Sequence, residues 1–77
     1  MEKRSEFCEK DGILITYNDK TVCFEDCKTA DSVLFNNDGE ILNSNFDEEK
    51  NNYFRKYFNQ IYKSVITLRN IDGLEIA

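Results

Sequence analysis

The chain has 77 residues, of which 40% are hydrophobic and 32% are charged, and its formal net charge is -5. It contains no histidine, which excludes a catalytic triad built on histidine and a histidine-ligated metal, and its acid surplus disfavours direct binding of nucleic acid. A chain of this length buries only about 60% of its unfolded surface, so we expect one domain over residues 1–77, without enzymatic activity and without a cofactor.

Residues 1–11 are predicted to form a charged N-terminal arm. No apolar run follows the first residues, whereas a secretory signal needs about 7–15 apolar residues there. Cys8, Cys23 and Cys27 are odd in number and so do not form a complete disulfide framework. Free thiols are typical of a reducing compartment, which predicts a cytoplasmic protein with no membrane partner.

Residues 12–46 are predicted to form two β-hairpins. The first pairs residues 12–17 with residues 21–24 around a turn at Asn18-Asp19. A two-residue turn there places Ile15 opposite Val22 and Ile13 opposite Phe24, so that all four side chains share one face of the sheet.

The second hairpin pairs residues 32–35 with residues 40–43. The segment between them suits a type I turn with Gly39 in the left-handed region, which places Phe35 opposite Ile41 and Leu34 opposite Leu42. Both faces of this hairpin are then apolar, and one of them lacks an obvious cover.

Residues 47–70 are predicted to form a helix, followed by a tail at 71–77. Asn45 and Glu48 have the spacing of a capping box. Apolar residues recur there at steps of three and four: Tyr53, Phe54, Tyr57, Phe58, Ile61, Tyr62, Val65, Ile66 and Leu68. A β-branched run at 65–68 and the dipeptide Asp72-Gly73 leave a terminal hairpin over residues 65–77 as the alternative. The predicted fold class is therefore α+β: a small antiparallel sheet of two β-hairpins packed by one long C-terminal aromatic helix.

The apolar face of this helix spans roughly 220°, wider than one sheet covers. One interpretation places the tyrosines at a wet rim. The other makes Phe58, Tyr62 and Ile66 an apolar contact face for a partner or for a homodimer.

The cysteines offer a metal or redox site as a further alternative. Structural zinc takes four ligands, and the chain supplies three cysteines and no histidine. Glu25 and Asp26 precede Cys27 and raise the pKa of a neighbouring thiol, which opposes nucleophilic catalysis. We therefore expect no metal and no catalytic residue.

The acid surplus lies in residues 12–46, mostly at predicted strand ends and turns. A folded sheet would place these carboxylates along an acidic edge: Asp19, Glu25, Asp26, Asp31, Asp38 and Glu40. Such an edge attracts a protein with a basic surface. In composition the chain resembles small acidic inhibitors encoded by phages and mobile elements, anti-CRISPR proteins among them. The resemblance implies a protein-binding inhibitor or modulator of a basic or nucleic-acid-handling partner, with a self-associating subunit as the alternative.

Overall fold

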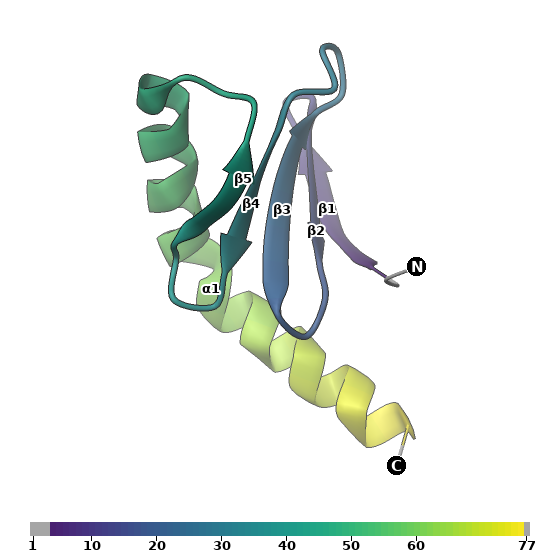
Figure 1. The fold of residues 1–77 in the computed structure, drawn as a ribbon. Helices are drawn as coiled ribbons and strands as arrows, with labels where there is room; N and C mark the ends of the chain where they lie inside the picture. The colour runs from purple at the N-terminus through teal and green to yellow at the C-terminus, as the bar shows by residue number, and fades with distance from the viewer. Residues whose placement is uncertain (1–3, 77) are drawn as a thin grey trace.

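The part of the chain that the structure describes forms five antiparallel strands and one long helix (Figure 1). The computed structural model describes the backbone of residues 4–76 and the side chains of residues 4–71. The strands follow one another in sheet order: β1 (Ser5–Lys10), β2 (Ile13–Tyr17), β3 (Thr21–Asp26), β4 (Ser32–Asn36) and β5 (Ile41–Ser44). Helix α1 (Glu48–Ile76) lies diagonally across one face of the sheet, which confirms the predicted α+β class.

The first strand, β1, occupies residues that the sequence suggested to be an arm. It pairs with β2 across a tight turn at Asp11 and Gly12, whose φ angles of 54° and 80° are those of a type I′ hairpin turn. The pairing shifts between Glu6 and Cys8, and this bulge allows both Phe7 and Cys8 to pack against the core. The bulge and the charged residues hide the strand's alternating pattern, so the turn dipeptide is its clearest sequence signal.

The register of the β2–β3 hairpin differs from the prediction by two residues. Tyr17 pairs with Val22 and Ile15 pairs with Phe24. The Asn18 side chain accepts hydrogen bonds from the backbone N–H of Lys20 at 2.9 Å and of Thr21 at 2.8 Å, so it opens the turn instead of occupying its centre. A shift of two residues leaves each side chain on its predicted face, because side chains alternate with a period of two.

The β4–β5 hairpin follows the prediction at its turn and departs from it one pair further on. Gly39 has a φ of 82°, and Phe35 pairs with Ile41, both as predicted. Leu34 then pairs with Asn43 rather than with Leu42, because the ladder is irregular between Leu34 and Phe35. Leu42 is the extra residue of this bulge and is 54% exposed.

Helix α1 begins at Glu48, one residue after the predicted start, and ends at Ile76, six residues beyond the predicted limit of 70. The Asp47 side chain, rather than that of Asn45, caps it by accepting a hydrogen bond from the Lys50 N–H at 2.9 Å. The helix continues through residues 72 and 73 to Ile76, so the predicted end near residue 70 is too early and the terminal hairpin is wrong. Val65 packs into the core as a helical residue, and the Arg69 guanidinium donates to the Asn18 carbonyl oxygen at 2.8 Å, which fixes the helix against the β2–β3 turn.

The core lies between α1 and the central strands, and it is largely aromatic. Phe24 and Phe35 meet edge to face at 5.7 Å between ring centroids, and Phe54 and Phe58 of α1 pack on them at 5.3 and 5.1 Å. The buried set is Ile15, Tyr17, Val22, Phe24, Val33, Phe35, Phe54, Phe58 and Val65.

The face of the sheet that points away from α1 has only a partial cover. Thr16, Cys23 and Leu34 lie side by side across β2, β3 and β4, and all three are half-buried. Arg4 donates hydrogen bonds to the hydroxyls of Thr16 at 3.1 Å and Thr21 at 2.7 Å, so it covers one end of this face.

Candidate functional site

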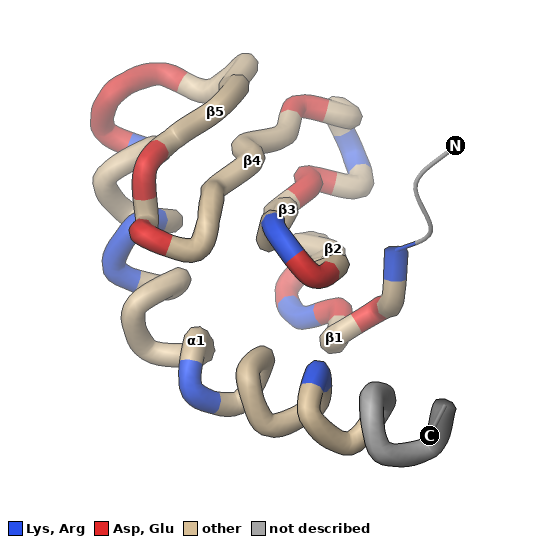
Figure 2. The backbone as a smooth tube through the Cα atoms, turned by 60° about the horizontal axis from the view of Figure 1, so that its bottom comes forward, with Lys and Arg blue, Asp and Glu red and all other residues tan. Residues whose placement is uncertain are grey.

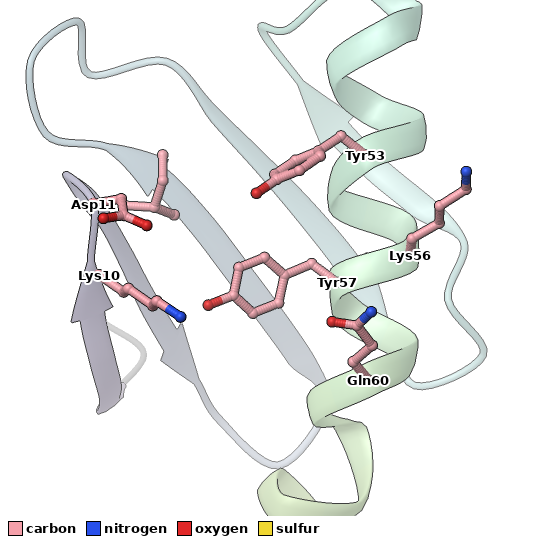
Figure 3. A pocket seen from close by; sticks show the side chains of 7 residues that line it. Lys10, Asp11, Tyr53, Lys56, Tyr57 and Gln60 are labelled. Carbon is pink, nitrogen blue, oxygen red and sulfur yellow. The ribbon is translucent and has the colours of Figure 1, made fainter.

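A groove runs between the first half of α1 and the turn that joins β1 to β2 (Figure 3). One end has a volume of about 460 Å³ and is lined by Lys10, Asp11, Ile13, Tyr53, Lys56, Tyr57 and Gln60. We call it the tyrosine end. The other end has a volume of about 430 Å³ and is lined by Asp11, Ile13, Asp26, Phe46, Asp47, Glu49, Lys50, Tyr53 and Phe54. We call it the acidic end. Three lining residues are common to both ends, so the two form one continuous groove.

The groove exists because one helix does not cover a five-stranded sheet. Phe54 and Phe58 pack over β3 and β4, whereas the side facing β1 and β2 is reached by tyrosine rings. Tyr57 packs on Phe24 at 5.4 Å between centroids, and Tyr53 contacts Phe54 at 5.2 Å while remaining 61% exposed. A tyrosine suits such a position because its ring is apolar and its hydroxyl stays in contact with water.

The tyrosine end brings hydrogen-bond donors together over an apolar floor. Figure 3 shows the rings of Tyr53 and Tyr57 projecting from α1 toward β1 and β2, with the ammonium group of Lys10 reaching toward the Tyr57 hydroxyl. Gln60 stands one helical turn further along the same face. Lys56 contributes to the lining, but its side chain extends away from β1.

The acidic end collects four carboxylates from three separate segments of the chain: Asp11, Asp26, Asp47 and Glu49. Two of them are held in place by backbone groups. Asp26 accepts from the Lys28 N–H at 2.8 Å, and Asp47 caps α1. Lys50 is the basic residue at this end, and its ammonium lies over the Phe46 ring at 5.7 Å from the centroid.

The six carboxylates that the sequence suggested as one acidic edge lie in two separate groups along the backbone, on which Figure 2 marks the acidic residues in red. Asp19, Asp38 and Glu40 lie in the β2–β3 and β4–β5 turns, which are joined by a hydrogen bond from the Asn37 side chain to the Asp19 carbonyl oxygen.

The other three predicted carboxylates belong to β3 and the connection that follows it. Asp26 and Asp31 bracket this connection, where the Asp26 N–H donates to the Asp31 carbonyl oxygen at 2.8 Å. Glu25 pairs with Leu14 and with Ser32, on the face opposite α1. Asp26 is the one member of the predicted edge that lines the groove.

Sequence reasoning missed the other three carboxylates of the acidic end. Asp11 belongs to the β1–β2 turn, which the sequence analysis does not predict, whereas Asp47 caps α1 and Glu49 lies in its first turn. The Asp11-Gly12 dipeptide is the signal that could have placed Asp11 at a hairpin tip beside the β3–β4 connection.

The predicted apolar contact face on α1 is only partly at the surface. Phe58 is 2% exposed and packs on Phe35, so its assignment to a contact face is wrong: the β4–β5 hairpin covers it. Tyr62 stacks on Phe58 at 5.0 Å between ring centroids, and the Arg69 guanidinium lies over the Tyr62 ring at 5.9 Å from its centroid. Ile66 remains 38% exposed.

The three cysteines lie in different environments. Cys8 packs against the core, Cys23 lies on the face opposite α1, and Cys27 is exposed with its Sγ 3.8 Å from a Glu9 carboxylate oxygen. Desolvation and the charges of Glu9 and Glu25 raise the pKa of the Cys27 thiol, and burial raises the pKa of the Cys23 thiol. Among the described residues, no group of three or more cysteine or carboxylate side chains is arranged to hold a metal ion.

Comparisons with known proteins give no indication of this chain's function. No family model matches the chain, and neither the curated proteins nor the solved structures include a match to it. Within the described residues, α1 has no stretch apolar enough over the length needed to cross a bilayer.

Proposed function

We propose that this chain is a non-enzymatic protein-binding module that holds a basic segment of a partner protein in its groove. The observation that supports the proposal is the acidic end, where four carboxylates from three chain segments face one lysine beside aromatic rings. The occupant is an extended segment that carries lysine or arginine.

The lining of the acidic end suits such a segment in two ways. Carboxylates attract the basic group over long range and speed its encounter with the groove. Phe46, Tyr53 and Phe54 offer ring surface on which the methylene stem of a lysine or the plane of an arginine guanidinium packs.

Inhibition or modulation follows from the same binding when the basic segment has another ligand. A partner that uses that segment to contact nucleic acid would lose the contact while this chain occupies it. We therefore propose that the chain belongs to the same functional class as the small acidic inhibitors that it resembles in composition.

Two matched triple variants test the proposal. The first carries Asp11→Asn, Asp26→Asn and Glu49→Gln and removes three charges from the acidic end. Each amide retains an acceptor oxygen, and asparagine tolerates the positive φ of residue 11. The second carries Asp19→Asn, Asp38→Asn and Glu40→Gln and makes the same change of net charge in the β2–β3 and β4–β5 turns.

Binding is measured by the fluorescence anisotropy of a labelled, end-capped peptide with arginines at alternate positions in an alanine host. An exposed charge pair contributes about 0.2–1 kcal/mol, so the groove variant should bind about tenfold more weakly than the unmodified protein. The control variant should bind nearly as well as the unmodified protein. Equal losses of affinity in the two variants would show that net charge alone governs binding and would refute the proposal. Failure of the unmodified protein to bind the peptide would also refute it.

The same pair of variants identifies the natural partner. A partner captured from a lysate at low salt by the unmodified protein and by the control variant, but not by the groove variant, is one that uses the acidic end. Its capture should decline as the salt concentration rises, because mobile ions screen exposed charges.

A further inference from the structure

The two ends of the groove have opposite chemistry. The acidic end presents carboxylates, whereas the tyrosine end presents the Lys10 ammonium, the hydroxyls of Tyr53 and Tyr57, and the Gln60 amide. All four groups donate hydrogen bonds, and the ammonium adds a positive charge. A segment whose charged residues are all basic neutralises the carboxylates of the acidic end but offers no side-chain acceptor to the donors of the tyrosine end.

We propose that the tyrosine end binds a carboxylate side chain of the same bound segment. The groove then selects partner segments in which a lysine or arginine and an aspartate or glutamate are separated by a fixed spacing. This inference rests on the proposed function, since it assumes that a basic residue of the segment occupies the acidic end.

The position of Asp11 limits where the carboxylate can lie. Asp11 lines both ends of the groove and repels an anion placed beside it. The favourable position is therefore away from Asp11, toward Tyr57 and Gln60, within reach of the Lys10 side chain as Figure 3 shows it.

A carboxylate fits this end better than a phosphate group. Lys56 extends away from β1, so Lys10 is the lysine that reaches this position, and its one positive charge with three neutral donors matches a single negative charge. A phosphate monoester carries about two negative charges near neutral pH and is usually matched by arginine pairs. The neighbouring Asp11 raises the cost of the second charge.

The geometry of α1 sets the spacing. Glu49 and Tyr57 are eight residues apart on the helix, which corresponds to about 12 Å at about 1.5 Å per residue. An extended peptide covers about 13 Å in four residues at about 3.3 Å each, and residues four apart point to the same side. The selected pattern therefore has the basic and acidic residues four positions apart.

Three end-capped alanine-based peptides test this pattern by ¹⁵N NMR titration of the full chain. The first carries an arginine and a glutamate four positions apart, the second replaces the glutamate by glutamine, and the third brings the arginine and glutamate to two positions apart. We expect the first to bind three- to fivefold more tightly than the other two. Net charge alone predicts the opposite order of affinity for the glutamate and glutamine peptides, because an acidic protein repels the added glutamate.

Two protein variants locate the effect. Lys10→Gln should abolish the preference for glutamate over glutamine, while Lys20→Gln, an equal charge change in the exposed β2–β3 turn, should preserve it. Tyr57→Phe keeps the ring on Phe24 and removes one donor, so the preference should decrease.

The possible results distinguish a failure of this inference from a failure of the proposed function. Equal binding of the glutamate and glutamine peptides, a preference that survives Lys10→Gln, or equal binding at both spacings would overturn the inference and leave the binding of basic segments intact. Failure of every arginine peptide to bind would instead overturn the proposed function.

Discussion

The layer between α1 and the sheet has a closed half and an open half. In the closed half, over β3 to β5, phenylalanine rings from the helix and the sheet meet directly and exclude water. In the open half, over β1 and β2, the same helix presents Tyr53 and Tyr57, and a groove remains between it and the β1–β2 turn.

The difference arises from a few atoms on otherwise equivalent helical positions. Phe54 and Phe58 are one helical turn apart, as are Tyr53 and Tyr57. The hydroxyls of the tyrosines and the charges of Lys10 and Asp11 keep the second pair wet, and so the open half offers a binding surface that the closed half does not.

The largest expected effect comes from truncating a ring in the closed half. Phe24→Ala should lower the free energy of unfolding by about 3–5 kcal/mol, because Phe24 is fully buried and contacts three other rings. Tyr53→Ala in the open half should cost less than about 1 kcal/mol. Urea denaturation followed by circular dichroism measures both, and Phe24→Leu serves if the alanine variant does not fold. Equal costs at the two sites would contradict the division into halves.

The wall of the open half depends on a strained turn. Gly12→Ala should cost about 1–2 kcal/mol, because the φ of 80° at this position disfavours a side chain. No atom lies within 4 Å of a Cβ built there, so the cost is one of backbone strain. Gly12→Asn should be milder, since asparagine tolerates the left-handed region. Unfolding by urea decides the order, and equal costs for the two variants would argue against strain.

A smaller effect is expected where the far end of α1 meets the turns. Arg69 donates to Asn18 at 2.8 Å and to the Asn37 side chain at 2.9 Å, so Arg69→Met should cost about 1 kcal/mol while leaving peptide binding in the groove unchanged. Arg55→Met is the control, because Arg55 is exposed and bonds to Asn52 within the same helix. A loss of peptide binding in the Arg69 variant would show that the two ends of the molecule are coupled.

The smallest effect concerns Cys27, whose backbone N–H donates to Gly12 at the wall of the groove. Glu9→Gln should lower the pKa of the Cys27 thiol, increase its thiolate fraction at pH 7.5 and speed its alkylation by iodoacetamide several-fold. Mass spectrometry of the fragment that contains Cys27 separates this reaction from those of the other two thiols. Glu6→Gln is the matched control on the same strand, and an equal acceleration there would remove the specific role of Glu9.

The sequence predicts the elements with strong local patterns and misses those whose signal is a single turn. The helix and both hairpins follow from their periodicity, and the faces of β2 and β3 are correct although the register differs by two residues. Strand β1 has too few apolar residues for its period to show, and the Asp11-Gly12 turn is the element that defines it.

The same dipeptide has different outcomes at two positions in this chain. Asp11-Gly12 forms a hairpin turn because β1 and β2 both find partners in the sheet. Residues 72 and 73 continue α1, because Val65 is buried and Arg69 is bonded to the turns, so the preceding residues are already committed to the helix. Tertiary contacts therefore determine whether an Asp-Gly dipeptide forms a turn or continues a helix.

The candidate site was the least predictable part for the same reason. Its carboxylates come from residues 11, 26, 47 and 49, and only the fold brings these positions together. A charge count along the chain locates the acid surplus in residues 12–46, and thereby includes Asp26 but omits the other three.

Mapping a bound basic peptide on the unmodified protein shows directly whether the groove is the binding site. In a ¹⁵N NMR titration with the alternating arginine peptide, we expect the largest shift changes on the amides of residues 10–13 and 47–57. The turn at residues 37–40 should change little, although it carries two acidic residues of its own. Changes centred on that turn, or spread evenly over the acidic residues, would contradict the groove as the binding site.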